Sequence, residues 1–233
     1  MLEVRGLNAF YGDAHILHDV ALQVEQGQRV ALLGRNGAGK STFLKSVMNA
    51  GPGVHGSVCF EGKNLSNLPS YQRARLGIAL VPEDRQIIPH LSVLENIAMA
   101  SHARAGRPAL TPRQIVEHFS MLEPLVKRYG GQLSGGQQQL LAIARAFAGG
   151  PKLLFLDEPT EGLAPIIVQG MVDEILDICA NNGTALLLCE QNIWFSRACT
   201  DYVYIIDTGK LVFHGDWRAF DANPEITQRY LSV

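Results

Sequence analysis

Few of the residue patterns that mark metal-binding, redox or nucleic-acid-binding proteins occur in this chain. Its 233 residues include four cysteines but no Cys-x-x-Cys pair, so neither a zinc ribbon nor a redox dithiol is supported. The seven histidines show no His-Glu-x-x-His spacing, so a metal ion would have to arrive with a substrate. A net charge of −2 and a pI near 6.4 argue against a nucleic-acid partner. We therefore expect buried, reduced thiols at Cys59, Cys179, Cys189 and Cys199.

Long hydrophobic runs are also missing, although 47% of the residues are hydrophobic. No stretch approaches the roughly 18 uncharged apolar residues that a membrane-spanning helix needs. The first residues, Met1-Leu2-Glu3-Val4-Arg5, lack a signal-peptide pattern. We therefore expect one compact globular unit in the cytosol, whose role at a membrane would depend on partner proteins.

Strand and helix patterns alternate along much of the chain, which is typical of an α/β protein with a mostly parallel sheet. Short apolar or alternating runs predict strands at residues 2–7, 21–24, 30–33, 57–60, 78–81, 153–156, 185–188, 202–206 and 211–214. From Asp84 to about Gly150 the pattern is helical, apart from a polar loop at residues 102–110. Capping boxes predict helix starts at Ser92 and Thr111. The middle segment therefore resembles a helical lobe inserted into an α/β core, with one apolar face formed by Ile115, Phe119 and Leu122.

A phosphate-binding loop is predicted between the strand at 30–33 and an apolar helix that passes through Phe43. The eight residues from position 34 fit G-x-x-x-x-G-K-[ST], and the required strand and helix flank them. Their glycines allow backbone N–H groups to wrap phosphates, while Lys40 should reach the β- and γ-phosphates and the Ser41 hydroxyl should hold Mg²⁺. The candidate nucleotide-binding residues are Gly34, Arg35, Asn36, Gly37, Ala38, Gly39, Lys40, Ser41 and Thr42.

A second candidate anion site lies at a predicted helix start around Ser134. Ser134 and Gln137 have capping-box spacing, and Gly135 and Gly136 leave the first turn without side chains. Exposed backbone N–H groups at a helix N-terminus attract anions. An ordinary glycine-rich helix cap is the alternative interpretation.

Two carboxylates follow the apolar run Leu153 to Leu156. Because carboxyl ends of parallel strands face the ligand crevice, Asp157 is the candidate Mg²⁺ ligand. Glu158 is the natural candidate to accept a proton from an attacking water. The alternative is a solvated turn, which the apolar residues just before it disfavour.

These motifs, in this order and spacing, resemble those of an ATP-binding cassette (ABC) ATPase, from Met1 to about Gly215. The resemblance implies a P-loop (RecA-like) nucleotide-binding core with an antiparallel β lobe and an inserted helical lobe. Core and β lobe would take residues 1–83 and 151–233, and the helical lobe residues 84–150. It implies head-to-tail dimers that sandwich two ATP molecules. Tyr11 would then stack on adenine, although a half-buried strand tyrosine is the plainer alternative. The γ-phosphate held by the other subunit would meet Ser134, Gly135, Gly136 and Gln137.

Three positions depart from the family's usual pattern. Glu83 stands where a glutamine normally links Mg²⁺ and water to the helical lobe, so a metal role for its carboxylate is open. Gln191 stands where a histidine normally contacts the γ-phosphate, and an amide cannot become cationic. Ala164 replaces an aspartate that usually crosses the dimer interface, which could couple the two sites less tightly.

Together the departures resemble the ATPases of branched-chain amino-acid importers, a group that includes urea, amide and aromatic-acid importers. The chain resembles the shorter of the two paired ATPases. Expected partners are a second ATPase subunit, which could be a paralogue or the same chain, membrane permease subunits and, indirectly, a periplasmic binding protein. That places the chain on the cytoplasmic face of the inner membrane. A soluble, non-transport ABC ATPase and an exporter motor are the alternatives. Ile87, Ile88 and Leu91 could contact a permease or form lobe core.

Overall fold

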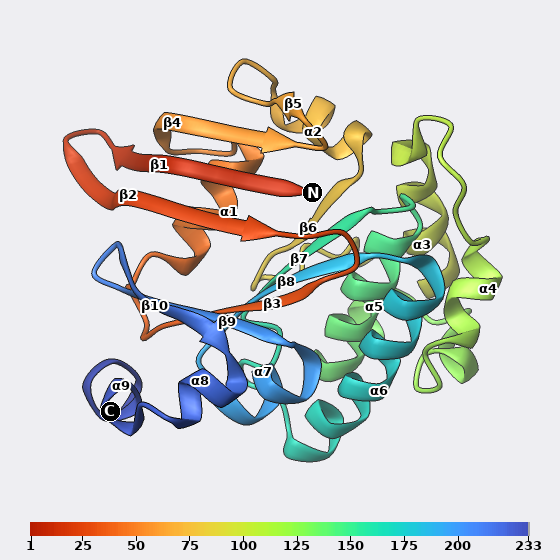
Figure 1. The fold of residues 1–233 in the computed structure, drawn as a ribbon. Coiled ribbons are helices and arrows are strands. Elements are labelled where there is room, and N and C mark those ends of the chain that lie inside the picture. Colours follow the sequence, from red (N-terminus) through yellow and green to blue (C-terminus); the bar gives the residue numbers. More distant parts are fainter. Residues whose placement is uncertain (233) are drawn as a thin grey trace.

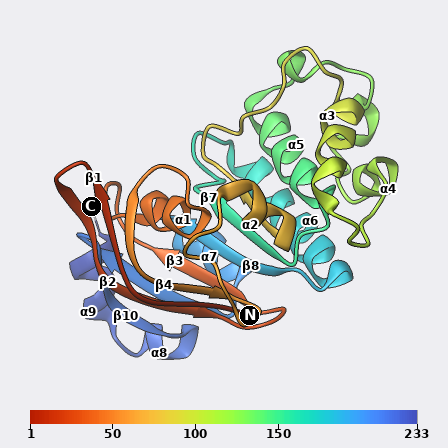
Figure 2. The ribbon, with the colours of Figure 1, turned by 90° about the horizontal axis from the view of Figure 1, so that it is seen from above.

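The computed structural model describes residues 1–232, which form two sheets and a cluster of helices. Figure 1 shows the smaller sheet above the larger one, with helix α1 between them and the remaining long helices beneath and beside the larger sheet. Figure 2 shows that α3, α4 and α5 stand to one side of both sheets.

The smaller sheet is antiparallel, as the family resemblance implied. Its strand order is β2-β1-β4-β5. Alternate residues of β1 are buried, so one face packs on α1 and the other faces solvent. The strands are β1 (Leu2–Tyr11), β2 (Ala14–Val24), β4 (Gly53–Phe60) and β5 (Lys63–Asn64).

The larger sheet is mostly parallel, in the order β10-β9-β3-β8-β7-β6. All neighbours pair in parallel except β9 and β10, which form a hairpin. Its central strands are apolar runs because helices or the second sheet cover both faces. The strands are β3 (Arg29–Leu33), β6 (Ile78–Val81), β7 (Leu153–Asp157), β8 (Ala185–Glu190), β9 (Tyr202–Asp207) and β10 (Lys210–Asp216).

Helices outside the middle segment cover the sheets. Side chains of α1 fill the space between the two sheets, while α6 and α7 pack against the other face of the parallel sheet. No helix within residues 1–232 has the length and apolar character needed to cross a membrane. These helices are α1 (Lys40–Met48), α2 (Ser70–Leu76), α6 (Pro165–Asn182), α7 (Ile193–Cys199), α8 (Trp217–Asp221), α9 (Pro224–Ile226) and the π-helical turn η4 (Thr227–Leu231).

The middle segment is helical as predicted, and the reciprocal caps at Ser92, Thr111 and Ser134 are all present. Two details differ from expectation. The helix after Thr111 ends at Glu117, so the buried Phe119 and Leu122 follow it instead of continuing its face. The predicted polar loop begins as a 3₁₀ turn. The elements are α3 (Val93–Ala100), η1 (Ser101–Arg104), α4 (Pro112–Glu117), η2 (Glu123–Leu125), η3 (Gly130–Gln132) and α5 (Gly135–Phe147).

All four cysteines are free thiols, as expected. Cys59 is only half-buried, however, because it lies on the solvent-facing side of β4. Burial raises the pKa of Cys179 and of Cys199 to about 12, so these two thiols remain protonated.

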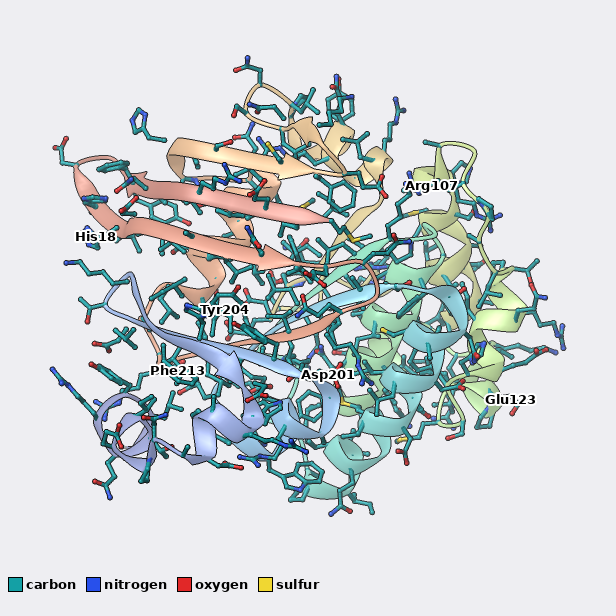
Figure 3. All side chains as sticks on the ribbon, in the orientation of Figure 1. His18, Arg107, Glu123, Asp201, Tyr204 and Phe213 are labelled. Carbon is teal, nitrogen blue, oxygen red and sulfur yellow. The ribbon has the colours of Figure 1, made fainter. Side chains whose placement is uncertain are left out.

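Tyr204 connects the two sheets. Its ring lies between β2 and β9 in Figure 3, and its hydroxyl accepts a hydrogen bond from the Gln23 backbone N–H at 3.3 Å. The side chain is 8% exposed, so this bond satisfies a polar group at a largely apolar junction.

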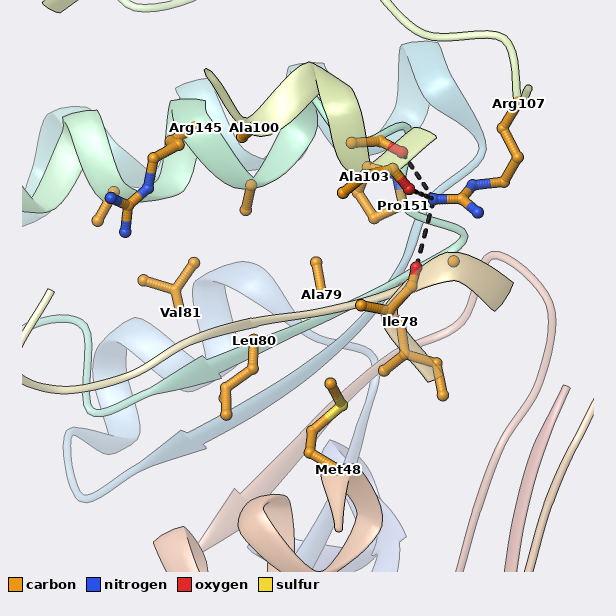
Figure 4. A pocket seen from close by; sticks show the side chains of 15 residues that line it. Met48, Ile78, Ala79, Leu80, Val81, Ala100, Ala103, Arg107, Arg145 and Pro151 are labelled. Atoms are coloured by element: carbon orange, nitrogen blue, oxygen red, sulfur yellow. Dashed lines mark hydrogen bonds between the residues drawn. The ribbon is translucent and has the colours of Figure 1, made fainter. Parts of the chain in front are cut away.

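Arg107 connects the helical segment to the core. Its guanidinium donates to carbonyls of Ala74 (3.3 Å), Ala103 (3.1 Å) and Gly149 (2.8 Å), and also to those of Arg75 and Gly150. These carbonyls belong to the end of α2, to η1 and to the turn after α5. Figure 4 shows Arg107 at one end of an apolar pocket of ≈ 270 Å³ between β6 and the helical segment.

We expect Arg107→Ala to destabilise the protein by about 1–3 kcal/mol, because several carbonyls lose their donor at once. Chemical denaturation would measure this as a lower midpoint of unfolding. The matched control is Arg113→Ala, on an exposed position of α4, which should change stability by less than about 0.5 kcal/mol. Equal effects of the two substitutions would contradict a connecting role for Arg107.

Candidate functional site

The phosphate loop links the end of β3 to the start of α1, as the sequence predicted. Gly39 has φ +113°, which a side chain would strain, and its N-cap position offers no side-chain hydrogen bond to the first turn of α1. A Cβ on Gly34 would lie 2.4 Å from the Ile206 carbonyl oxygen. The loop thus approaches β9 closely, and the first N–H groups of α1 remain available to an anion.

Lys40 is buried beneath this loop, with 3% of its surface exposed. Its ammonium donates to the carbonyls of Gly34 (2.7 Å) and Arg35 (3.0 Å) and pairs with Glu158 Oε1 at 3.0 Å. Lys40 follows β3, whereas Glu158 follows β7, two strands away in the parallel sheet. The fold therefore brings together two residues that the sequence could nominate only separately.

Ser41 and Asp157 also meet at this edge. The Ser41 hydroxyl donates to Asp157 Oδ1 at 3.0 Å. The pKa of Asp157 is raised to about 6, chiefly by burial; the Ser41 bond opposes the rise, and the charges of Glu158 and Glu83 contribute to it. These two hard oxygen donors suit Mg²⁺, which commonly uses one or two protein oxygens together with phosphates and water. The donor set therefore fits the metal expected from the sequence.

Glu158 is 8% exposed and has φ +45°, an unfavourable backbone conformation for a side chain of its size. Its second oxygen, Oε2, accepts from Gln191 Nε2 at 3.0 Å, and the same amide nitrogen lies 2.7 Å from Asn36 Oδ1. Burial tends to raise the pKa of Glu158, but the hydrogen bonds and charge of Lys40, aided by Gln191, hold it below its usual value. The carboxylate is therefore ionised and oriented.

Two further glutamates belong to this cluster, although the sequence analysis did not propose them. Glu190 is 3% exposed and accepts hydrogen bonds from Thr160 N, Thr160 Oγ1 (2.6 Å), Gln191 N and Asn192 N. It fixes the turns after β7 and β8. Hydrogen bonding to Glu158, aided by desolvation, raises the pKa of Glu161. The sequence could have identified Glu190 by its position, because it is a carboxylate at the end of a parallel strand.

Other candidate residues lie apart from these contacts. Tyr11 is 44% exposed at the end of β1, so its ring is accessible. Glu83 is exposed in the loop after β6, close enough to raise the pKa of Asp157 by its charge. Ala164 is the N-cap of α6 and supplies no capping side chain. Ile87 packs against the core of the helical segment, which favours the lobe-core alternative for that residue.

The helix start at Ser134 has the expected capping box but does not join the phosphate loop. Ser134 Oγ accepts from Gln137 N at 3.4 Å, and Gln137 Oε1 accepts from Ser134 N at 3.0 Å. A Cβ on Gly136 would lie 2.9 Å from Ile167, so α5 approaches α6 closely there. Within residues 1–232, no hydrogen bond or ion pair links Ser134–Gln137 to residues 34–41. One chain thus presents two separate candidate phosphate sites.

The chain shares its sequence pattern and its fold with known proteins. Residues 17–161 match the family described as ABC transporter. It is 38% identical over 232 residues to the high-affinity branched-chain amino acid transport ATP-binding protein BraG of Pseudomonas aeruginosa, covering 99% of each chain. It is 34% identical over 217 residues to the probable branched-chain amino acid transport ATP-binding protein LivF of Archaeoglobus fulgidus, covering 92% of each.

Solved structures agree with the fold. The solved structure of an ATP-binding subunit of an ABC transporter has a TM-score of 0.80 and 28% identity, over 98% of this chain and 94% of the other. A dimeric ATP-binding cassette in a post-hydrolysis state, bound to ADP and Pi, also has a TM-score of 0.80, over 93% of this chain and 98% of the other. Its 24% identity shows the shared fold alone.

The raised pKa of Asp157 predicts a pH-dependent stability for the metal-free protein. Since the folded-state pKa, about 6, exceeds the ordinary 3.8, the folded state binds more protons than the unfolded state between these values. Stability should therefore fall as the pH rises from about 4 to 6, by at most about 3 kcal/mol. Asp157→Asn should reduce this fall in denaturant titrations with a metal chelator present. Parallel pH profiles for the two proteins would rule out this assignment.

Proposed function

The chain belongs to the ABC transporter family, and from this premise we propose that it is the ATP-hydrolysing subunit of an importer for branched-chain amino acids or a related small polar solute. The observation that carries the proposal is full-length similarity to an ATP-binding subunit named for branched-chain amino-acid transport. The cluster of Lys40, Ser41, Asp157 and Glu158 supplies the chemistry that such a subunit needs.

Lys40 and the phosphate loop capture the nucleotide. Backbone N–H groups of residues 34–42 surround the phosphates, and Lys40 neutralises the β- and γ-phosphate oxygens. Lys40 is paired with Glu158 by a single 3.0 Å contact, so the more highly charged phosphates compete effectively for it. Nucleotide capture thereby releases one oxygen of Glu158.

Glu158 accepts a proton from the water that attacks the γ-phosphorus, while the bond from phosphorus to the β–γ bridging oxygen breaks and ADP leaves. Gln191 keeps the carboxylate in place through its 3.0 Å hydrogen bond. Ser41 and Asp157 would hold Mg²⁺, which when bound would neutralise charge on the phosphates. Glu83 is exposed in the loop after β6 and acts on this metal region by its charge, and its own role as a metal ligand stays a prediction.

A second cassette completes the site. Tyr11 stacks on the adenine of the nucleotide bound by its own chain, and Ser134, Gly135, Gly136 and Gln137 meet the γ-phosphate bound by the partner in a head-to-tail dimer. This arrangement explains why the capped, side-chain-free helix start lies away from its own phosphate loop. The dimer drives membrane permease subunits from the cytoplasmic face of the membrane, and a periplasmic binding protein delivers the solute to them.

Glu158→Gln should preserve nucleotide binding and lower ATP turnover by on the order of 10²-fold or more, because the amide cannot take up the proton. Phosphate release and nucleotide affinity would be measured on the same preparations. Glu117→Gln, on the exposed face of α4, is the isosteric control and should keep the parent rate. A decrease of only a few-fold would remove Glu158 from the role of base.

Reconstitution tests the transport function. We expect the chain to co-purify in detergent with membrane permease subunits of its transporter, and to support ATP-dependent uptake of labelled leucine into proteoliposomes supplied with the binding protein. The Glu158→Gln chain is the control, and it should bind the permease without supporting uptake. Uptake of urea, an amide or an aromatic acid in place of leucine would assign the chain to an importer of that solute within the same group. A chain that binds no permease subunit would contradict the transport role.

A further inference from the structure

The loop between β6 and α3 is fastened to the helix that starts at Ser134. Arg85 and Gln86 both have left-handed backbone conformations, with φ +61° and +46°. Arg145, on the last turn of α5, donates to the Gln86 carbonyl at 2.7 Å and to the Arg85 carbonyl at 3.1 Å. These bonds oppose the backbone strain and hold the Arg85 side chain against α5.

The guanidinium of Arg85 lies beside the first turn of α5. Its Nε donates to Gln139 Oε1 at 3.1 Å, and its Nη1 lies 3.2 Å from the position that a Cβ on Gly135 would occupy. A side chain at Gly135 would therefore require the guanidinium to shift by a few tenths of an ångström. Gly135 thus leaves room for the Arg85 guanidinium, a reason for glycine at this position that the sequence alone does not give.

Apart from their bond to each other, two polar side chains at this place are only partly satisfied. Gln139 is 2% exposed, and its Nε2 has no hydrogen-bond partner among the described residues. Gln139 follows Gly135 by one helical turn, and helical side chains lean toward the N-terminus, so its amide extends toward that first turn. Within residues 1–232, Arg85 forms no ion pair with a carboxylate.

This charge arrangement favours the binding of an anion. The N-terminus of α5 carries a partial positive charge, and its capping box uses the N–H of Gln137 but not those of Gly135 and Gly136. A guanidinium beside it adds a second positive charge. A free amide donor is buried at the same turn. A multiply charged oxyanion, such as the terminal phosphate of a nucleotide, would neutralise both the helix terminus and the guanidinium, which the buried Gln139 holds in place.

We propose that Arg85 contacts the γ-phosphate of the ATP held by the partner cassette, next to Ser134 and Gly136. The inference rests on the dimer of the proposed function and adds a charged, nucleotide-binding residue to it. The same short loop carries Glu83, whose charge raises the pKa of Asp157 in the chain's own site. The loop between β6 and α3 thus carries an acidic residue that acts on the chain's own site by its charge and, in this proposal, a guanidinium that contacts the partner's nucleotide.

The test uses ATP-dependent dimerisation of the Glu158→Gln chain, measured by analytical ultracentrifugation with and without the second ATPase subunit of the transporter. Arg85→Ala should weaken ATP-dependent association by on the order of 10- to 100-fold, the loss typical of one charge-assisted hydrogen bond. Arg85→Lys should restore part of it, since a cation remains. Arg113→Ala, on the same lobe, is the matched control and should associate like the parent.

Binding of fluorescent ADP to the monomer separates this role from a structural one. ADP affinity depends on the phosphate loop of the same chain, so Arg85→Ala should leave it unchanged. Unchanged ATP-dependent association of Arg85→Ala would overturn the proposal for Arg85 alone. Equal losses of ADP binding and of association, or failure of Lys to restore any association, would also overturn it. A parent chain that never dimerises with ATP would refute the dimeric site itself, and the role of Arg85 with it.

Discussion

The buried ion pair between Lys40 and Glu158 joins the two halves of the nucleotide site. Lys40 starts the helix after β3, and Glu158 follows β7, so their 3.0 Å contact depends on the order β3-β8-β7 in the parallel sheet. Both side chains are less than 9% exposed, and either charge alone would be costly at that depth. Gln191 reaches both Glu158 and Asn36 of the phosphate loop because it follows β8, the strand between β3 and β7. Strand order therefore assembles the reactive groups.

A small number of hydrogen bonds from two arginines attach the helical segment to the core and to the loop after β6. Arg107 holds the ends of α2, η1 and α5 together, and Arg145 holds the loop that carries Glu83 and Arg85. The ≈ 270 Å³ pocket beside Arg107 leaves the interface between β6 and the helices incompletely packed. An interface with strong polar connections and loose apolar packing can shift while remaining attached. That property would suit the proposed role, in which nucleotide binding by this chain moves membrane subunits.

Local sequence signals determined much of the fold. The phosphate loop could be recognised from its glycines and from the strand and helix that flank it. The three capping boxes could be identified from pairs of residues three positions apart. Apolar runs located the strands of the parallel sheet because burial on both faces leaves no polar alternation. The same local reasoning misjudged the helix after Thr111, which ends at Glu117 because tertiary packing, not periodicity, buries Phe119 and Leu122.

The sequence by itself determined the chemical inventory: a lysine and glycines for phosphates, two carboxylates at a strand end, and a capped helix start without side chains. Only the tertiary structure decided which of these groups meet. Residues as distant as Asn36, Glu158 and Gln191 form one hydrogen-bonded cluster, whereas Ser134 lies apart from the phosphate loop. Arg85 could be proposed as a nucleotide-binding residue only from the structure, which places its guanidinium beside Gly135. Such contacts depend on strand order and helix packing, which arise from nonlocal burial that no short sequence motif encodes.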